Sequence, residues 1–329
     1  MEKLRAVVLA AGEGKRMRSK LPKVLHPLCG RPMIDYIIES AVTLTADLTV
    51  VIGHGASLVK PVLGSQLRAV LQEKQLGTGH AVRQALNEMA DDGKLLVLCG
   101  DTPLVEANHL ESLVAQSENL AAAVATVEMD NPTGYGRIIR NRFGLVEKII
   151  EEKDAALPEK DIHEINTGMY CFDLKLLHYY IHLIKNNNAQ KEYYLTDVIS
   201  LLSKDGYKVG VYKIGDSRVG LGINDREQLA EATRLMRKKI NRKLLLGGVT
   251  MLDPDSVYID YDVVIGQDTI IYPNVVIEKN TTIGNKCIIG PNVHLKNSKI
   301  HNGVAIRFSA VENSIIKSNT VIDLFSNLS

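Results

Sequence analysis

The sequence lacks a charge bias and any long apolar run. Its 39 lysines and arginines nearly balance its 38 aspartates and glutamates, so no global field attracts nucleic acid or a membrane surface, and we expect neither partner. No stretch approaches the ~20 apolar residues of a membrane span. The apolar run after Arg5 ends by Gly12, which is too short for a secretion signal. Any anionic ligand must therefore be recognised locally.

Paired cysteines are also missing. Cys29, Cys99, Cys171 and Cys287 are scattered, without a CxxC pair or a metal-ligand spacing. Their distribution fits reduced thiols and predicts a cytoplasmic protein. The composition, 45% hydrophobic and 23% charged, is that of a globular protein with an ample core. A length of 329 residues predicts roughly two domains.

Two common phosphate-binding motifs are absent, yet residues 7–23 read as a phosphate loop of another kind. A P-loop would need Ser or Thr where Arg16 stands, and a dinucleotide fingerprint would need Gly in place of Met17. An apolar strand instead runs into a loop with Gly12 and Gly14, whose small size allows backbone N–H groups to approach an anion. The loop also carries the cations Lys15, Arg16, Arg18 and Lys23. The alternative is an ordinary tight turn with solvated cations.

Short apolar runs alternate with amphipathic segments along the first two-thirds of the chain. The strand candidates are Ala6–Ala10, Leu48–Ile52, Leu67–Leu71, Lys94–Cys99, Ala121–Val127 and Lys208–Tyr212. The helix candidates include Met33–Thr43, Gly79–Met89 and Val105–Ser117. This alternation predicts an α/β domain over residues 1–226, with a largely parallel sheet covered by helices on both faces.

A long helix and a six-residue repeat follow. Asp225–Leu246 has apolar residues at helical spacing and stops at a Gly-Gly pair, which predicts a connecting helix over 227–248. Aliphatic residues then recur every six positions at Ile259, Ile265, Ile271, Ile277, Ile283, Ile289 and Leu295, and the register slips before Ile300 and Ile306. The period predicts a parallel β-helix over 249–329, left-handed by analogy with other hexapeptide folds, although the general crossover rule favours right-handed connections.

Two more groups of polar residues suggest chemistry. Asp101 closes an apolar run at the expected ligand edge of the sheet, where one carboxylate together with phosphates can hold Mg²⁺; the alternative is an Asp that opens a turn. Gln72 and Gln75 precede a glycine-rich segment and present amides that suit a planar heterocycle. Thr78 offers a competing role as a helix cap. We expect His80 to be a structural residue on the helix face.

Seven segments occur in a recognisable order: LAAGEGKRMRSKLPKVLH, LQEKQLGTGHA, GDTPL, NPTGYGRI, EINTG, NNNAQKEYYLTD and GLGIND. Together they resemble the bacterial bifunctional UDP-N-acetylglucosamine pyrophosphorylase/glucosamine-1-phosphate N-acetyltransferase family. The resemblance implies a Rossmann-like sugar-nucleotidyltransferase domain with a mixed, mostly parallel sheet, a connecting helix and a short left-handed β-helix. It also implies Mg²⁺-dependent uridylyl transfer from UTP to N-acetylglucosamine 1-phosphate, yielding UDP-N-acetylglucosamine and pyrophosphate for cell-wall synthesis, in a cytoplasmic homotrimer.

The resemblance assigns roles residue by residue. Arg16 and Lys23 would contact the phosphates in transfer, and Asp101 and Asn224 would hold Mg²⁺. The remaining nucleotide and sugar contacts would come from Leu9, Ala10, Ala11, Gly12, Gln72, Gly77, Thr78, Cys99, Gly100, Gly136, Glu151, Asn166, Tyr194 and Thr196. Of these, Gln72 and the Gly77-Thr78 pair would read the uracil, and Cys99 stands where the family often has Tyr.

Other functions remain open at this point. The chain stops before the later coils that build the family's acetyltransferase site, and His294 and His301 read as structural. We therefore expect no acetyl transfer. A related enzyme acting on another sugar 1-phosphate or on dTTP, and a non-catalytic trimer that binds nucleotide sugars, are the alternatives to uridylyl transfer.

Overall fold

A computed structural model of the chain describes residues 3–323 and 326–328. It contains two compact units: Met1–His26 with Met33–Arg226, and Pro27–Pro32 with Glu227–Ser329. The ends of the predicted ranges 1–226 and 249–329 include residues that lie outside the described ones. The three-part division stays a prediction, since the connecting helix here groups with the repeat region. Among the residues described, no helix is both long and apolar enough to cross a lipid bilayer.

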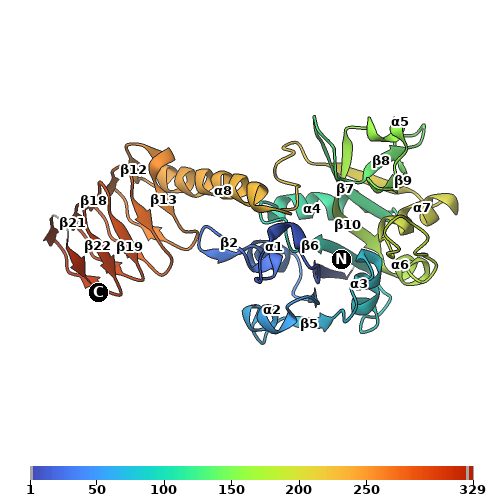
Figure 1. Ribbon diagram of the computed structural model, residues 1–329, viewed down its shortest axis with the longest axis horizontal. Coiled ribbons are helices and arrows are strands. Elements are labelled where there is room, and N and C mark those ends of the chain that lie inside the picture. The colour runs from blue at the N-terminus through green and yellow to red at the C-terminus, as the bar shows by residue number, and fades with distance from the viewer. Residues whose placement is uncertain (1–2, 324–325, 329) are drawn as a thin grey trace. The chain divides into compact units, whose positions relative to one another are not determined.

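The first unit is built on a mixed sheet (Figure 1). Its main path runs in the order β11 (Val209–Lys213), β7 (Ala122–Glu128), β10 (Glu164–Asp173), β6 (Lys94–Cys99), β1 (Leu4–Ala10), β4 (Leu48–Ile52) and β5 (Arg68–Leu71). Strand β10 runs antiparallel to both of its neighbours, and the other pairs on this path are parallel. A hairpin of β8 (Arg137–Arg140) and β9 (Val146–Ile150) branches from β10. The expected mostly parallel α/β domain is confirmed.

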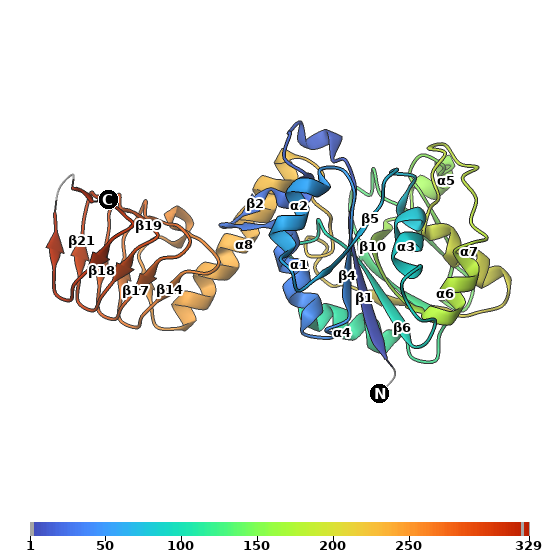
Figure 2. The same ribbon diagram turned by 90° about the horizontal axis from the view of Figure 1, so that it is seen from below.

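Helices cover both faces of this sheet, because side chains alternate along each strand. On β1, Val8 packs in one core cluster with Ile37, whereas Val7 packs in the opposite cluster with Val82. Figure 2 shows α1 (Met33–Val42), α2 (Ala56–Leu63) and α4 (Ala107–Gln116) on one side, with α3 (Thr78–Leu86), α6 (Leu174–Tyr180) and α7 (Thr196–Lys204) on the other. A short α5 (Leu157–Lys160) follows the β8–β9 hairpin.

The register of β1 and β6 brings their carboxyl ends together. Leu9 pairs with Cys99 in the parallel ladder, and the N–H of Gly100 donates to the Leu9 carbonyl at 2.9 Å. The glycine loop that follows β1 and the Gly100-Asp101 turn that follows β6 therefore leave the sheet side by side. This is the edge at which open α/β sheets bind ligands.

The second unit combines α8 (Arg226–Leu246) with a β-helix. The helix buries Ala232, Met236 and Ile240 on one face, as the spacing predicted. Buried Asn241 fixes the helix to the first coil, because its Nδ2 donates to the carbonyls of Pro254 and Val257 at 2.8 and 3.2 Å. The segment of β2 (Pro27–Leu28) and β3 (Arg31–Pro32) also belongs to this unit, through the Tyr261 N–H that donates to the Cys29 carbonyl at 2.9 Å.

The β-helix has three flat parallel sheets, consistent with the left-handed hexapeptide fold (Figure 1). Its strands are β12 (Thr250–Met251), β13 (Tyr258–Ile259), β14 (Val264–Ile265), β15 (Ile270–Ile271), β16 (Val276–Ile277), β17 (Thr282–Ile283), β18 (Ile288–Ile289), β19 (His294–Lys296), β20 (Lys299–Ile300), β21 (Ala305–Ile306), β22 (Ala310–Glu312), β23 (Ile315–Ile316), β24 (Val321–Ile322) and β25 (Asn327–Leu328). Ile283 pairs with Ile300, and Ile300 pairs with Ile316, so later coils are shorter than the first. The slip in the repeat is thus a shortening of the corners, and the coils continue beyond Ile306.

Candidate active site

A cleft of about 480 Å³ opens at the carboxyl edge of β1 and β6. The predicted residues that line it are Leu9, Ala10, Ala11, Gly12, Lys23, Gln72, Gly77, Thr78, Cys99 and Asp101. Glu13, Val24 and Ala81 line it too, and sequence reasoning gave them no role in the site. The lining also includes Lys15, expected as a cation of the phosphate loop, Gln75, expected as part of the amide patch, and Glu192, which belongs to a polar segment of the sequence. Segments far apart in the sequence therefore share one cavity, as a ligand site requires.

The glycine loop wraps around the stem of Lys23. Gly14 has a φ of 64°, and a Cβ on it would lie 2.7 Å from Cβ of Lys23, so a larger residue would collide with the lysine. Buried Met17 anchors the short helical turn that follows, Lys15–Met17. Lys15 lines the cleft, whereas Arg16 is exposed and lies outside the lining. The predicted phosphate contact of Arg16 stays a prediction.

Lys23 and Asp101 of the lining meet Asn224, which is not itself among the lining residues. The Lys23 ammonium forms an ion pair with Asp101 Oδ2 and donates to Asn224 Oδ1 at 3.1 Å. The Asn224 amide is oriented by the Gly222 carbonyl, which can only accept and so takes a hydrogen bond from Nδ2 at 3.1 Å. The N–H of Ile223 donates to the Asp101 carbonyl at 2.9 Å and holds this loop beside the aspartate.

This oxygen pair fits a divalent cation. A carboxylate and an amide oxygen are hard donors of the kind that Mg²⁺ accepts, with phosphates and water completing its shell. Both oxygens already contact a positive charge, the ammonium of Lys23, whose side chain is 15% exposed. Asp101 and Asn224 would hold the ion, and the lysine would have to leave this position.

Gln72 lies on the opposite wall of the same cleft and is 3% exposed. Its Nε2 donates to the Gly77 carbonyl at 3.1 Å and contacts His80 Nδ1 at 2.9 Å. The cap role considered for Thr78 is wrong: Gly77 is the N-cap of α3, and Thr78 Oγ1 accepts from the Leu195 N–H at 3.1 Å. Thr78 thus joins the start of α3 to the segment that enters α7.

The five residues that the resemblance assigns to the sugar are Gly136 just before β8, Glu151 just after β9, Asn166 on β10, Tyr194 just before α7 and Thr196 at its start. Glu151 Oε1 accepts from Thr196 Oγ1 at 3.1 Å, and a Cβ on Gly136 would lie 3.5 Å from Glu151 Oε2 and 3.6 Å from Asn166 Cβ. Burial raises the pKa of Glu151 despite the hydrogen bond from Thr196, and neighbouring carboxylates add to the shift. Tyr194 is 7% exposed, and burial raises its pKa as well.

Strand β10 links this group to the cleft. The Asn166 side chain is held at both ends, because Nδ2 donates to Tyr170 Oη at 2.6 Å and Oδ1 accepts from the Gly168 N–H at 3.0 Å. Cys99 donates to the Gly168 carbonyl at an Sγ–O distance of 3.4 Å. Burial raises the pKa of this thiol to about 12, so Cys99 is a neutral packing group at neutral pH.

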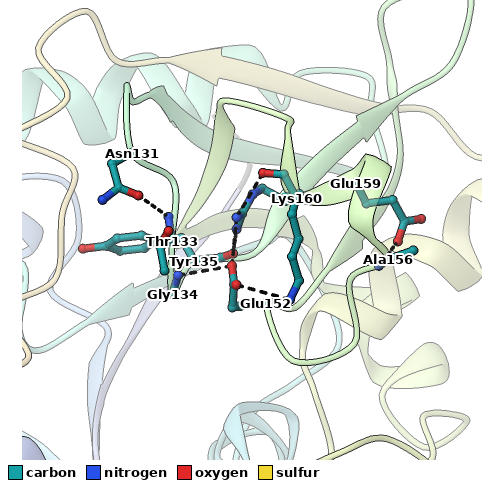
Figure 3. A network of polar contacts seen from close by, with 9 residues as sticks. Asn131, Thr133, Gly134, Tyr135, Glu152, Ala156, Glu159 and Lys160 are labelled. Carbon is teal, nitrogen blue, oxygen red and sulfur yellow. Dashed lines mark hydrogen bonds and ion pairs between the residues drawn. The ribbon is translucent and has the colours of Figure 1, made fainter.

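Glu152 stabilises the glycine turn that leads into Gly136 (Figure 3). Its Oε2 accepts from the Gly134 N–H at 3.2 Å and pairs with Arg137 at 2.8 Å, and its Oε1 lies 3.8 Å from Lys160 Nζ. Burial alone would raise the pKa of Glu152, but the Gly134 N–H and the Arg137 guanidinium hold that pKa below its usual value. The environments of the adjacent Glu151 and Glu152 thus shift their pKa values in opposite directions, upward for Glu151 and downward for Glu152.

Comparison with known proteins identifies this architecture. Residues 6–157 match the MobA-like NTP transferase domain, and residues 262–297 match the bacterial transferase hexapeptide (six repeats). The bifunctional protein GlmU of Halalkalibacterium halodurans is 47% identical over 98% of this chain and 72% of its own length. GlmU of Listeria monocytogenes is 46% identical over 100% of this chain and 73% of its own length. A solved structure assigned as a glucose-1-phosphate thymidylyltransferase of Bacillus anthracis has a TM-score of 0.56 at 21% identity, covering 71% of this chain and 95% of that one, and shares the fold.

The cleft and the matched domains define a nucleotidyltransferase joined to a hexapeptide-repeat β-helix. The chain belongs to the family of the bifunctional GlmU proteins. Both the family and the fold class predicted from the motifs are confirmed. Its enzyme class is that of the UDP-N-acetylglucosamine diphosphorylases.

Removing the ammonium from the Asp101–Asn224 pair should strengthen cation binding to the free protein. We expect Lys23→Met to raise the affinity for Mn²⁺ about fivefold in the absence of nucleotide, because a partly buried ion pair no longer competes. Calorimetric titration with Mn²⁺ measures this. Lys15→Met is the control, since Lys15 lines the same cleft but pairs with Glu13 at 3.1 Å. Equal affinities of wild type and Lys23→Met would contradict the competition.

The same substitution at adjacent glutamates should shift the thermal midpoint in opposite directions. Glu151→Gln keeps an acceptor for Thr196 and removes a charge whose pKa is raised by burial. We expect its Tm at pH 7 to rise by roughly 2 °C or more. A raised folded-state pKa destabilises the fold only where the group ionises, so the gain should vanish below about pH 4.

Glu152→Gln serves as the matched comparison. It leaves the guanidinium of Arg137, whose side chain is 2% exposed, without its anionic partner. We therefore expect its Tm to fall. Differential scanning calorimetry from pH 4 to pH 8 measures both variants, and shifts of the same sign at pH 7 would contradict the assignment of these environments.

Proposed function

We propose that the chain catalyses Mg²⁺-dependent transfer of the uridylyl group from UTP to N-acetylglucosamine 1-phosphate, giving UDP-N-acetylglucosamine and pyrophosphate for cell-wall precursors. The observation that carries this proposal is that Asp101 Oδ2 and Asn224 Oδ1 both contact one positive charge, the ammonium of Lys23. The membership of the GlmU family and the matched transferase domain support it.

The reaction is a displacement at phosphorus. An oxygen of the sugar phosphate, already largely dianionic at pH 7 because its second pKa is about 6, attacks the α-phosphorus of UTP. The bond from the α-phosphorus to the bridging oxygen breaks, and pyrophosphate leaves with both electrons of that bond. No general base is required, so positioning and charge neutralisation dominate catalysis.

The residues of the cleft divide this work. A magnesium ion, when bound, supplies charge neutralisation at the phosphate oxygens. Lys23 releases Asp101 and turns to the phosphates, aided by Arg16, while the backbone of Leu9–Gly12 cradles the nucleotide. Gln72 and the Gly77-Thr78 pair read the uracil. The sugar lies among Gly136, Glu151, Asn166, Tyr194 and Thr196, with Cys99 and Gly100 beneath the nucleotide.

The assembly and location belong to the same proposal. We infer a homotrimer formed through the β-helix, an oligomerisation supported by the hexapeptide match. We infer a cytoplasmic protein, since Cys29, Cys99, Cys171 and Cys287, all within the described residues, form no disulfide and nucleoside triphosphates are the proposed substrates.

Release of pyrophosphate tests the proposed reaction. We expect UTP with N-acetylglucosamine 1-phosphate to be preferred within a panel of nucleotides and sugar 1-phosphates, and activity to disappear with a chelator. Asp101→Ala should lower kcat by about a thousandfold, because a ligand of the cation that neutralises the transferring phosphates is lost. Circular dichroism serves as the folding control. Retained turnover in Asp101→Ala, or preference for dTTP, would contradict the proposal.

Absence of acetyl transfer stays a prediction for the 329-residue chain. His294 Nε2 lies 2.8 Å from Glu278 Oε1, which supports a structural role for this histidine. We expect no consumption of acetyl-CoA with glucosamine 1-phosphate, measured by thiol release. A rate comparable with pyrophosphate release would overturn this expectation.

A further inference from the structure

The amide nitrogen of the Gln72 side chain is engaged in hydrogen bonds within the protein, whereas its oxygen, Oε1, is available to a ligand. Both hydrogens of its amide nitrogen are used: one bonds to the Gly77 carbonyl at 3.1 Å, and the other points to His80 Nδ1 at 2.9 Å. In the described part of the chain, no hydrogen bond to Oε1 is present, although Gln72 lines the cleft. The amide therefore offers an incoming base an acceptor and no donor.

Its neighbours force this orientation. The Gly77 carbonyl can only accept, so the amide nitrogen has to face it. With the nitrogen fixed there, the ring atom 2.9 Å away has to accept as well, and His80 carries its proton on Nε2. Gln84 Nε2 lies 3.3 Å from that second ring nitrogen, and with the His80 proton on Nε2 the Gln84 amide has to turn over so that its oxygen accepts this proton.

The setting of His80 keeps the ring neutral. Burial lowers the pKa of His80, and the positive charge of Arg83 lowers it further. A protonated ring would place an N–H against the Gln72 N–H and drive the amide to turn over. The helix α3 thus carries, two residues after Thr78, a group whose acceptor nitrogen determines which end of Gln72 faces the cleft.

We propose that His80 is a positioning residue that locks Gln72 with Oε1 toward the base, so that the site selects an imide N–H, as in uracil, over the bare ring nitrogen of cytosine. This inference rests on the proposed uridylyl transfer. Uracil N3 carries a hydrogen that Oε1 accepts, whereas cytosine N3 is itself an acceptor and meets Oε1 unfavourably. Without His80, the amide keeps only its bond to the Gly77 carbonyl, so the turned-over amide that would serve cytosine becomes easier to reach. His80 is thereby more than the structural residue on a helix face that its position in the sequence predicts.

Competition between UTP and CTP tests the inference. We expect His80→Leu to reduce the ratio of kcat/KM for UTP to kcat/KM for CTP by about tenfold or more, the cost of an unsatisfied buried group. His80→Asn should recover most of the ratio, because Asn Oδ1 can accept from Gln72 Nε2. A merely structural defect would lower both kcat/KM values in proportion and leave their ratio unchanged.

A double substitution shows whether His80 acts through Gln72. Gln72→Leu alone should reduce the ratio, and adding His80→Leu should reduce it no further, since the group to be oriented is gone. Additive effects, or a wild-type ratio in His80→Leu, would overturn the inference while leaving uridylyl transfer intact. Wild-type enzyme that fails to release pyrophosphate from UTP would instead overturn the proposed function.

Discussion

The site depends on bringing a carboxylate oxygen, Asp101 Oδ2, and a neutral amide oxygen, Asn224 Oδ1, to one cation, the Lys23 ammonium. More than a hundred residues separate them in the sequence, so only the tertiary fold can bring them together. The parallel register of β1 and β6 sets Asp101 beside the glycine loop, and the Ile223 N–H bound to the Asp101 carbonyl brings Asn224. Lys23 occupies the meeting point and offsets the charge of Asp101. The pair compensates two charges of low exposure, and a buried charge without a partner is costly.

Charge is divided between the two ends of the site, although the whole chain is almost neutral. Lys15 and Lys23 line the end beside the glycine loop, where phosphates need cations. Carboxylates surround Glu151, whose pKa is raised by burial and further by Asp154, Glu192 and Asp197. Such a cluster repels phosphates and offers acceptors to hydroxyl groups. In the proposed complex, these local charges would orient the sugar phosphate.

Sequence reasoning located the elements whose signal is local. The buried runs of β1, β4 and β6 were predicted almost to the residue, since continuous apolar stretches mark central parallel strands. Strand β10 was not among the predicted strands, because the polar residues Asn166 and Thr167 interrupt its apolar run. Local sequence patterns also could not predict that Pro27–Pro32 belongs to the second unit, because this depends on a contact with Tyr261, far along the chain. Motif resemblance gave the residues of the site, but not the contacts among them.

Those contacts follow a common rule that residue types alone do not reveal. Gln72 and Asn224 each have an amide that could face either way, and in each case a glycine carbonyl of the same loop, Gly77 or Gly222, binds the amide nitrogen, with His80 as a second partner at Gln72. A carbonyl can only accept, so it binds the nitrogen and leaves the amide oxygen for the ligand or the cation. In both loops the glycine-bearing backbone therefore sets which polar atom the cleft presents. The hydrogen bonds that each amide makes within its own short loop decide which atom it offers to a ligand. The sheet brings these loops together at one edge.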